Sequence, residues 1–166
     1  MDAHVNFEGY HPSSEGETFS ATLERGDPVP FARRQNLQLV VVVLYSIVPA
    51  SDNPRQWITS VKQYEYAIEN ETGQEILAYH WHPNSRNTPP WPHLHIGSAV
   101  LHANYKDLHK AHVRTERIAL EDVLWFAINE LKVPPTKRRE HDWRDVLAQE
   151  RETFERSLTR PTSGIE

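Results

Sequence analysis

Two short histidine pairs constrain the fold of this 166-residue chain more than any other feature. His80 and His82 form one pair, and His93 and His95 form the other. In an extended strand, side chains two residues apart point to the same face. If both segments are strands and pair as neighbours, four imidazoles converge on one face of a sheet. Because histidine is neither a good core residue nor a favoured strand former, such a cluster predicts a functional site.

The pattern of apolar residues before residue 100 predicts an antiparallel sheet of four to five strands. Asn36–Val48 is the clearest strand, because it is dense in β-branched residues. Short connections between successive strands favour a meander. The other predicted strands are Glu17–Leu23 as an edge strand, Trp57–Ile68, Glu75–His82 and His93–Val100.

After residue 118 the spacing of apolar residues becomes that of an amphipathic helix. Apolar residues recur every three or four positions across Ala119–Leu131, and Pro134-Pro135 forbids continuation of that helix. Asp142 is the expected N-cap of a second helix. The apolar stripe of that helix is Trp143, Val146, Leu147, Phe154 and Leu158. The sequence therefore predicts an α+β fold, with both C-terminal helices packed on one face of the sheet.

We expect one domain over residues 1–166, which is a length that supports a real core. Its expected parts are a weakly structured or edge-strand segment at 1–35, the sheet at 36–100, a loop and two helices at 101–159, and a tail at 160–166. No signal peptide is evident in residues 1–10, and the longest apolar run, Leu37–Tyr45, is too short to span a bilayer. The absence of cysteine excludes disulfides and thiol catalysis. We therefore expect a soluble cytoplasmic protein.

The formal net charge of −5 argues mildly against bulk nucleic-acid binding. Residues 80–117 are net positive by themselves, however, so a local basic site is compatible with the composition. His112, Arg114 and Arg117 lie just before the predicted helix at Ala119. Backbone N–H groups at a helix start bind anions, and either arginine can clamp a phosphate there. The alternative is a solvated loop whose basic residues pair with nearby carboxylates.

With nearby imidazoles, this basic segment supplies what metal-free RNA cleavage requires. One imidazole acts as general base on the 2′-hydroxyl, another protonates the leaving oxygen, and a cation stabilises the charge on phosphorus. His93 and His95 are the predicted proton-transfer residues, with His80 and His82 as partners. His112 is a further catalytic candidate. Tyr79 and Trp91 are candidates for stacking on bases, although aromatic residues at strand positions more often belong to a core.

The same histidines also support a different interpretation, in which they are metal ligands. Imidazole clusters suit zinc, nickel, copper or iron(II), and a catalytic zinc site uses three protein ligands plus water. His80, His82, His93 and His95 would then hold a divalent transition metal such as zinc, in a cupin-like or regulatory protein. Cupins normally add a carboxylate shortly after the histidine pair, and no carboxylate follows His95 here.

Residues 57–131 resemble the TumE-like toxin family, small bacterial proteins encoded with an antitoxin and presumed to act on RNA. The resemblance is carried by the strand that ends in Tyr79-His80-Trp81-His82, by Asn84 in the loop, by Pro92-His93-Leu94-His95-Ile96-Gly97 and by Leu120-Glu121-Asp122-Val123-Leu124. It implies an RNA substrate contacted by residues such as Asn84, a cognate antitoxin as partner, and no cofactor. The loop departs from the family pattern, which usually has Asp-Asn beside its histidines.

Three functions therefore stand after the sequence alone. The leading hypothesis is a metal-independent, RNA-cleaving toxin of a two-gene module that acts away from membranes. The first alternative is a histidine-ligated metal protein, and the second is a non-catalytic interaction module. A homodimer is compatible with all three.

Overall fold

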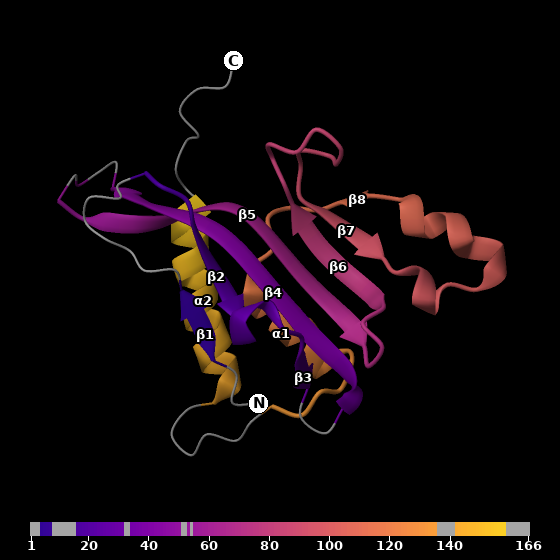
Figure 1. The fold of residues 1–166 in the computed structure, drawn as a ribbon. Coiled ribbons are helices and arrows are strands. Elements are labelled where there is room, and N and C mark those ends of the chain that lie inside the picture. The colour runs from indigo at the N-terminus through magenta and orange to yellow at the C-terminus, as the bar shows by residue number, and fades with distance from the viewer. Residues whose placement is uncertain are drawn as a thin grey trace.

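The computed structural model describes residues 4–7, 16–31, 34–50, 53, 55–135 and 142–158. These residues form an antiparallel sheet of eight strands followed by two C-terminal helices (Figure 1). The predicted α+β class is confirmed. The sheet is larger than the four to five strands expected, because three additional short strands pair with its longer ones.

The strands follow one another almost in chain order across the sheet. The order is β1-β2-β4-β5-β6-β7-β8, and β3 pairs with β4 beside this path. The predicted meander is thus confirmed for the four strands from β4 to β7, which are joined in sequence. The bounds are β1 Val5–Phe7, β2 Phe19–Leu23, β3 Val29–Phe31, β4 Arg34–Pro49, β5 Trp57–Asn70, β6 Glu75–Trp81, β7 His93–Ile96 and β8 Val113–Arg114.

Two predicted strands end earlier than expected. β6 ends at Trp81, so His82 lies just beyond the strand. β7 ends at Ile96, and Ser98–Val100 forms a short 3₁₀ helix, η2, in place of the predicted strand end. Two other 3₁₀ segments are η1 (Glu24–Gly26) and η3 (Ala103–Lys110).

The helices begin where the sequence predicts. α1 spans Leu120–Asn129, and the Asp122 carboxylate accepts a hydrogen bond from the backbone N–H of Ala119, 3.0 Å away. α2 spans Trp143–Leu158, and Asp142 accepts a hydrogen bond from the N–H of Arg144 as its predicted N-cap. An ion pair between Arg151 and Asp122 joins the two helices. None of the helices in the described part of the chain combines the length and hydropathy needed to cross a bilayer.

The hydrophobic core lies between one face of the sheet and α1. Tyr64 and Tyr66 of β5 stack with ring centroids 4.8 Å apart, and both belong to the buried cluster that includes Val123 and Ala127 of α1. In Figure 1 both helices lie behind the sheet, on this face. Because successive side chains of a strand alternate, Glu65 points to the opposite face.

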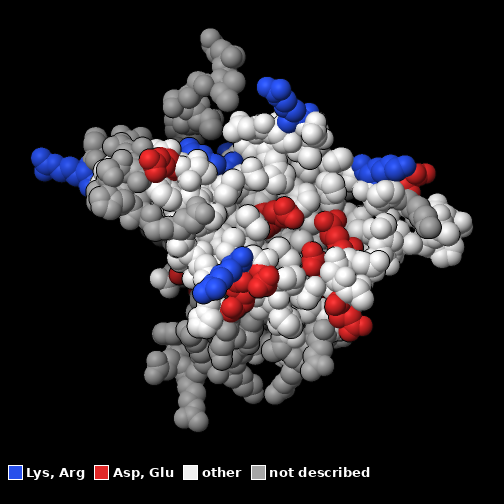
Figure 2. Space-filling model, viewed as in Figure 1, with Lys and Arg blue, Asp and Glu red and all other residues white. Residues whose placement is uncertain are grey.

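The face opposite the helices carries acidic side chains. Glu65 and Glu69 of β5 share it, and Glu69 accepts a hydrogen bond from the Gln38 side chain. Figure 2 shows acidic side chains gathered over the middle of this face. Burial raises the pKa of the nearby Glu75 carboxyl, and the charges of Glu65 and Glu69 raise it further. Several carboxylates therefore lie close together on this face beside β6.

Gly97 sets how closely β7 approaches β6. Its N–H donates to the carbonyl oxygen of Ile76, 2.8 Å away, and a side chain at this position would collide with the carbonyl of Glu75. Glycine is therefore required here for close approach of two backbones. The contact fixes the end of β7 against β6, on the strand pair that holds the histidines.

Candidate functional site

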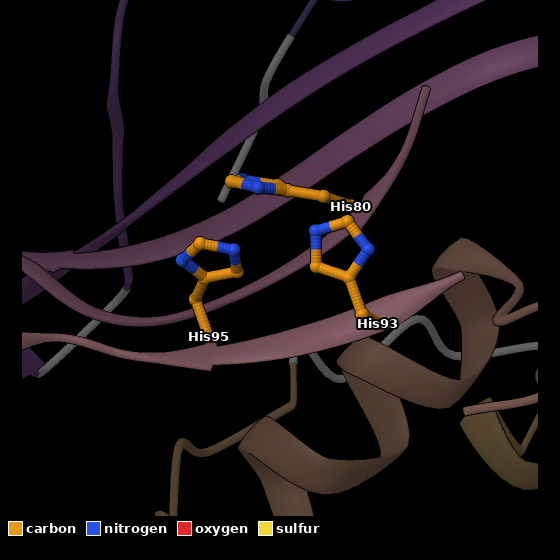
Figure 3. Close-up of side chains that lie close together, drawn as sticks. All are labelled: His80, His93 and His95. Atoms are coloured by element: carbon orange, nitrogen blue, oxygen red, sulfur yellow. The ribbon is translucent and has the colours of Figure 1, made fainter. Parts of the chain in front are cut away.

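Three histidines converge on the helix-free face of the sheet. The register of β6 and β7 places His80 directly opposite His93, and His95 lies two residues along on the same face. The ring centroids are 4.8 Å apart for His80 and His95, 5.0 Å for His93 and His95, and 5.8 Å for His80 and His93. Figure 3 shows the three rings grouped together above the strands. Strand alternation, as predicted, brings His93 and His95 to one face, which is also the face of His80.

The nitrogen atoms of these rings are close enough to share one ion. One nitrogen from each of His80, His93 and His95 lies within 4.8 Å of the other two. The Nε2 atoms of all three are buried and have no hydrogen-bond partner. The Nδ1–H group of His93 donates to the carbonyl oxygen of Trp91, 2.8 Å away. Because that proton is on Nδ1, the Nε2 atom of neutral His93 has a free lone pair.

The surroundings of the cluster favour neutral imidazoles. Burial and, to a smaller extent, the neighbouring histidines together lower the pKa of His80 to about 4. Burial and the same kind of repulsion lower the pKa of His95 to about 4. Burial also lowers the pKa of His93, although its hydrogen bond to Trp91 opposes the shift. At neutral pH these rings are uncharged, which is the form that ligates a metal.

His112 joins the cluster from a distant part of the sequence. It directly precedes β8, the edge strand that pairs with β7. Its ring centroid lies 4.5 Å from that of His95 and 5.0 Å from that of His93, and its side chain is exposed. The ring centroid of His82 lies 5.4 Å from that of His80. All five predicted histidines therefore gather in one region, with His80, His93 and His95 at its buried centre.

One residue of this region was missed by the sequence analysis. Glu65 of β5 lies opposite His80 in the sheet register, and its Oε1 atom is 3.8 Å from His80 Nε2. The alternation with Tyr64 and Tyr66 indicates that Glu65 faces away from the core. The pairing with His80 depends on the strand register, which no short-range pattern reveals.

The predicted phosphate- and base-binding residues divide between the two faces. Arg114 pairs with His93 in the register, and its guanidinium lies 5.8 Å from the Trp91 ring. Arg117 instead stacks over Trp81 at 3.8 Å, on the side of the sheet that faces the core. Tyr79 also packs against the core, whereas Asn84 is exposed in the loop after β6. Arg114, through the sheet register, and Trp91, through its carbonyl oxygen, are thus both neighbours of His93.

Comparison of the chain with protein-family models, with curated proteins and with solved structures finds no match. The resemblance to TumE-like toxins therefore stays a prediction, and the function is argued below from the site alone.

Proposed function

We propose that the protein binds one divalent transition-metal ion through the Nε2 atoms of His80, His93 and His95. The observation that carries this proposal is the convergence of three buried nitrogen atoms that have no hydrogen-bond partner. A buried polar atom without a partner costs roughly 1–3 kcal/mol. Three such atoms within 4.8 Å of one another are expensive unless an ion satisfies them together.

The hydrogen bond that orients one of the proposed ligands, His93, also supports a metal site. A metal-binding histidine usually donates its other ring N–H to a carbonyl or carboxylate, which fixes the orientation of the ring. His93 has this arrangement through Trp91. Imidazole suits zinc, nickel, copper and iron(II) among the biological metals. The acidic side chains of β5 also favour a cation on this face.

Three protein ligands leave a position free for water or a substrate, as in catalytic zinc sites. A metal ion bound there supplies Lewis-acid chemistry and lowers the pKa of a bound water molecule. The His112 ring lies beside His93 and His95 and is the exposed member of the histidine cluster. We therefore propose a metal-dependent enzyme whose substrate enters from the side of His112.

The experiment is a zinc titration of the metal-free protein in competition with a chromophoric chelator. We expect one equivalent to bind the wild type, and His95→Gln to weaken binding by at least about 100-fold. His109→Gln is the matched control, because this histidine is exposed on η3. Equal zinc affinity in wild type and His95→Gln would overturn the proposal.

Metal-independent RNA cleavage by the same histidines, in a toxin that a cognate antitoxin neutralises, is the second candidate. The position of Arg114 opposite His93, next to Trp91, favours it. The carboxylates of Glu65 and Glu69 weigh against it, because they repel a polyanion on this face. Cleavage of RNA that persists with a chelator and is lost in Arg114→Met would support this candidate over the metal enzyme. Complete loss of RNA cleavage in the presence of the chelator would reject the metal-independent candidate.

A further inference from the structure

Glu65 brings a carboxylate to the edge of the histidine cluster. Its Oε1 atom lies 3.8 Å from Nε2 of His80, which is one of the three buried nitrogen atoms. The separation is too long for a hydrogen bond. The neutral His80 ring is its closest potential ion-pair partner among the described residues, and no lysine or arginine there forms an ion pair with it. The contacts within the chain therefore leave this carboxylate without a strong partner.

The geometry of a metal site accounts for that position. Neighbouring ligands of an ion with bonds of about 2.0–2.2 Å lie roughly 3 Å apart. Glu65 must therefore move its carboxylate by about 1 Å relative to His80. It must also approach His93 and His95, because the group of potential ligand atoms within 4.8 Å of one another contains only the three histidines. Its side chain is 42% exposed and is free to make this movement. The side chain of His80 is 15% exposed and has less room to move.

We infer that Glu65 is the fourth protein ligand of the metal, an inference that rests on the proposed metal site. The site then has three imidazole nitrogens and one carboxylate oxygen, drawn from three neighbouring strands. An ion with five or six ligands keeps a position for water or substrate beside these four. The carboxylate neutralises one charge of a divalent ion in a half-buried place. An oxygen donor also favours zinc, manganese, iron(II), cobalt or nickel over copper(I), which prefers sulfur ligands.

Cobalt(II) tests the inference, because its visible spectrum reports the number and type of ligands. Wild type and Glu65→Gln are titrated with cobalt(II), and affinity and spectrum are recorded together. We expect Glu65→Gln to weaken binding by about 10-fold or more and to change the position or intensity of the visible bands. The glutamine has nearly the same shape, and circular dichroism checks that the fold is kept.

Glu69→Gln is the matched control, since it removes the same charge from the same face of β5. A spectrum that is unchanged in Glu65→Gln would overturn the inference, even if affinity falls, because charge alone would then explain the loss. Equal effects of both substitutions on affinity and spectrum would also overturn it. The metal site itself fails separately, if wild type binds no cobalt.

Discussion

The Nδ1–H group of His93 donates a hydrogen bond to the backbone carbonyl of Trp91, two residues earlier in the chain. The side chain of His93 is fully buried, and its Nε2 atom faces His80 and His95 without a hydrogen-bond partner. A backbone carbonyl can only accept, so this bond fixes the tautomer of the neutral ring. The loop after β6 therefore orients a buried nitrogen toward the other two.

The first prediction concerns this tautomer. In metal-free protein near neutral pH, we expect His93 to carry its proton on Nδ1, because the Trp91 carbonyl holds it there. Nitrogen-15 correlation spectra of labelled protein distinguish the two tautomers through the ring nitrogen shifts. The exposed His109 serves as an internal reference. A proton on Nε2 of His93 would contradict the orientation proposed for the ligand.

The second prediction concerns the pH dependence of stability without metal. The pKa values of His80 and His95 fall from the ordinary 6.5 to about 4 in the folded chain. At a pH between about 4 and 6.5, these two histidines bind protons in the unfolded chain but not in the folded chain. The free energy of unfolding is therefore greatest above pH 6.5 and decreases as pH falls toward 4, by at most roughly 1.4 kcal/mol per pH unit for each histidine.

Urea unfolding of chelator-treated protein between pH 4 and 7.5 measures this dependence. The double variant His80→Gln/His95→Gln has lost both groups and should show a flatter profile. If the unfolding free energy of wild type and of the double variant fell equally with pH, groups other than His80 and His95 would cause the acid sensitivity.

The third prediction concerns Gly97. We expect Gly97→Ala to lower the free energy of unfolding by about 1–3 kcal/mol, because a methyl group there forces β7 away from the backbone of Glu75. Metal affinity should fall as well, since the same shift separates His93 and His95 from His80. Ser98→Ala, at the exposed neighbouring position, is the control. A Gly97→Ala protein as stable as wild type would show that β7 can move freely.

The fourth prediction separates two roles for Arg117. Its guanidinium lies 3.8 Å from the centroid of the Trp81 ring, toward the core, which favours a structural role. The phosphate clamp stays a prediction. Arg117→Met should lower stability by about 0.5–2 kcal/mol and leave zinc affinity unchanged. Thermal unfolding and the zinc titration are compared with those of Arg114→Met. If Arg117→Met abolishes activity on RNA while stability is kept, the clamp interpretation is restored.

The long elements could be predicted from the sequence because each has a clear local period. The β-branched run within β4 and the three-to-four spacing of apolar residues in α1 both fall where the structure places them. The same alternation predicted that His93 and His95 share a face. β1, β3 and β8 could not be predicted, because strands of two or three residues exist through pairing with a longer neighbour.

The candidate site was predictable only in part, for the same physical reason. His80, His93 and His95 belong to segments whose local pattern fixes their direction. His112 reaches the cluster through the pairing of β8 with β7, and Glu65 through the register of β5 with β6. Both depend on contacts between residues far apart in the chain. No carboxylate follows His95 in the sequence, and Glu65 approaches His80 from β5, on the other side of β6.

The central claim is that three imidazoles bind one metal ion, and X-ray absorption at the zinc edge of the zinc-loaded protein tests it most directly. The account predicts nitrogen or oxygen ligands at about 2.0–2.1 Å with the outer-shell scattering of three imidazole rings. The His109→Gln protein should give the same spectrum, and His93→Ala should lose one ring. A spectrum without imidazole scattering, or a wild-type protein that retains no zinc, would contradict the account.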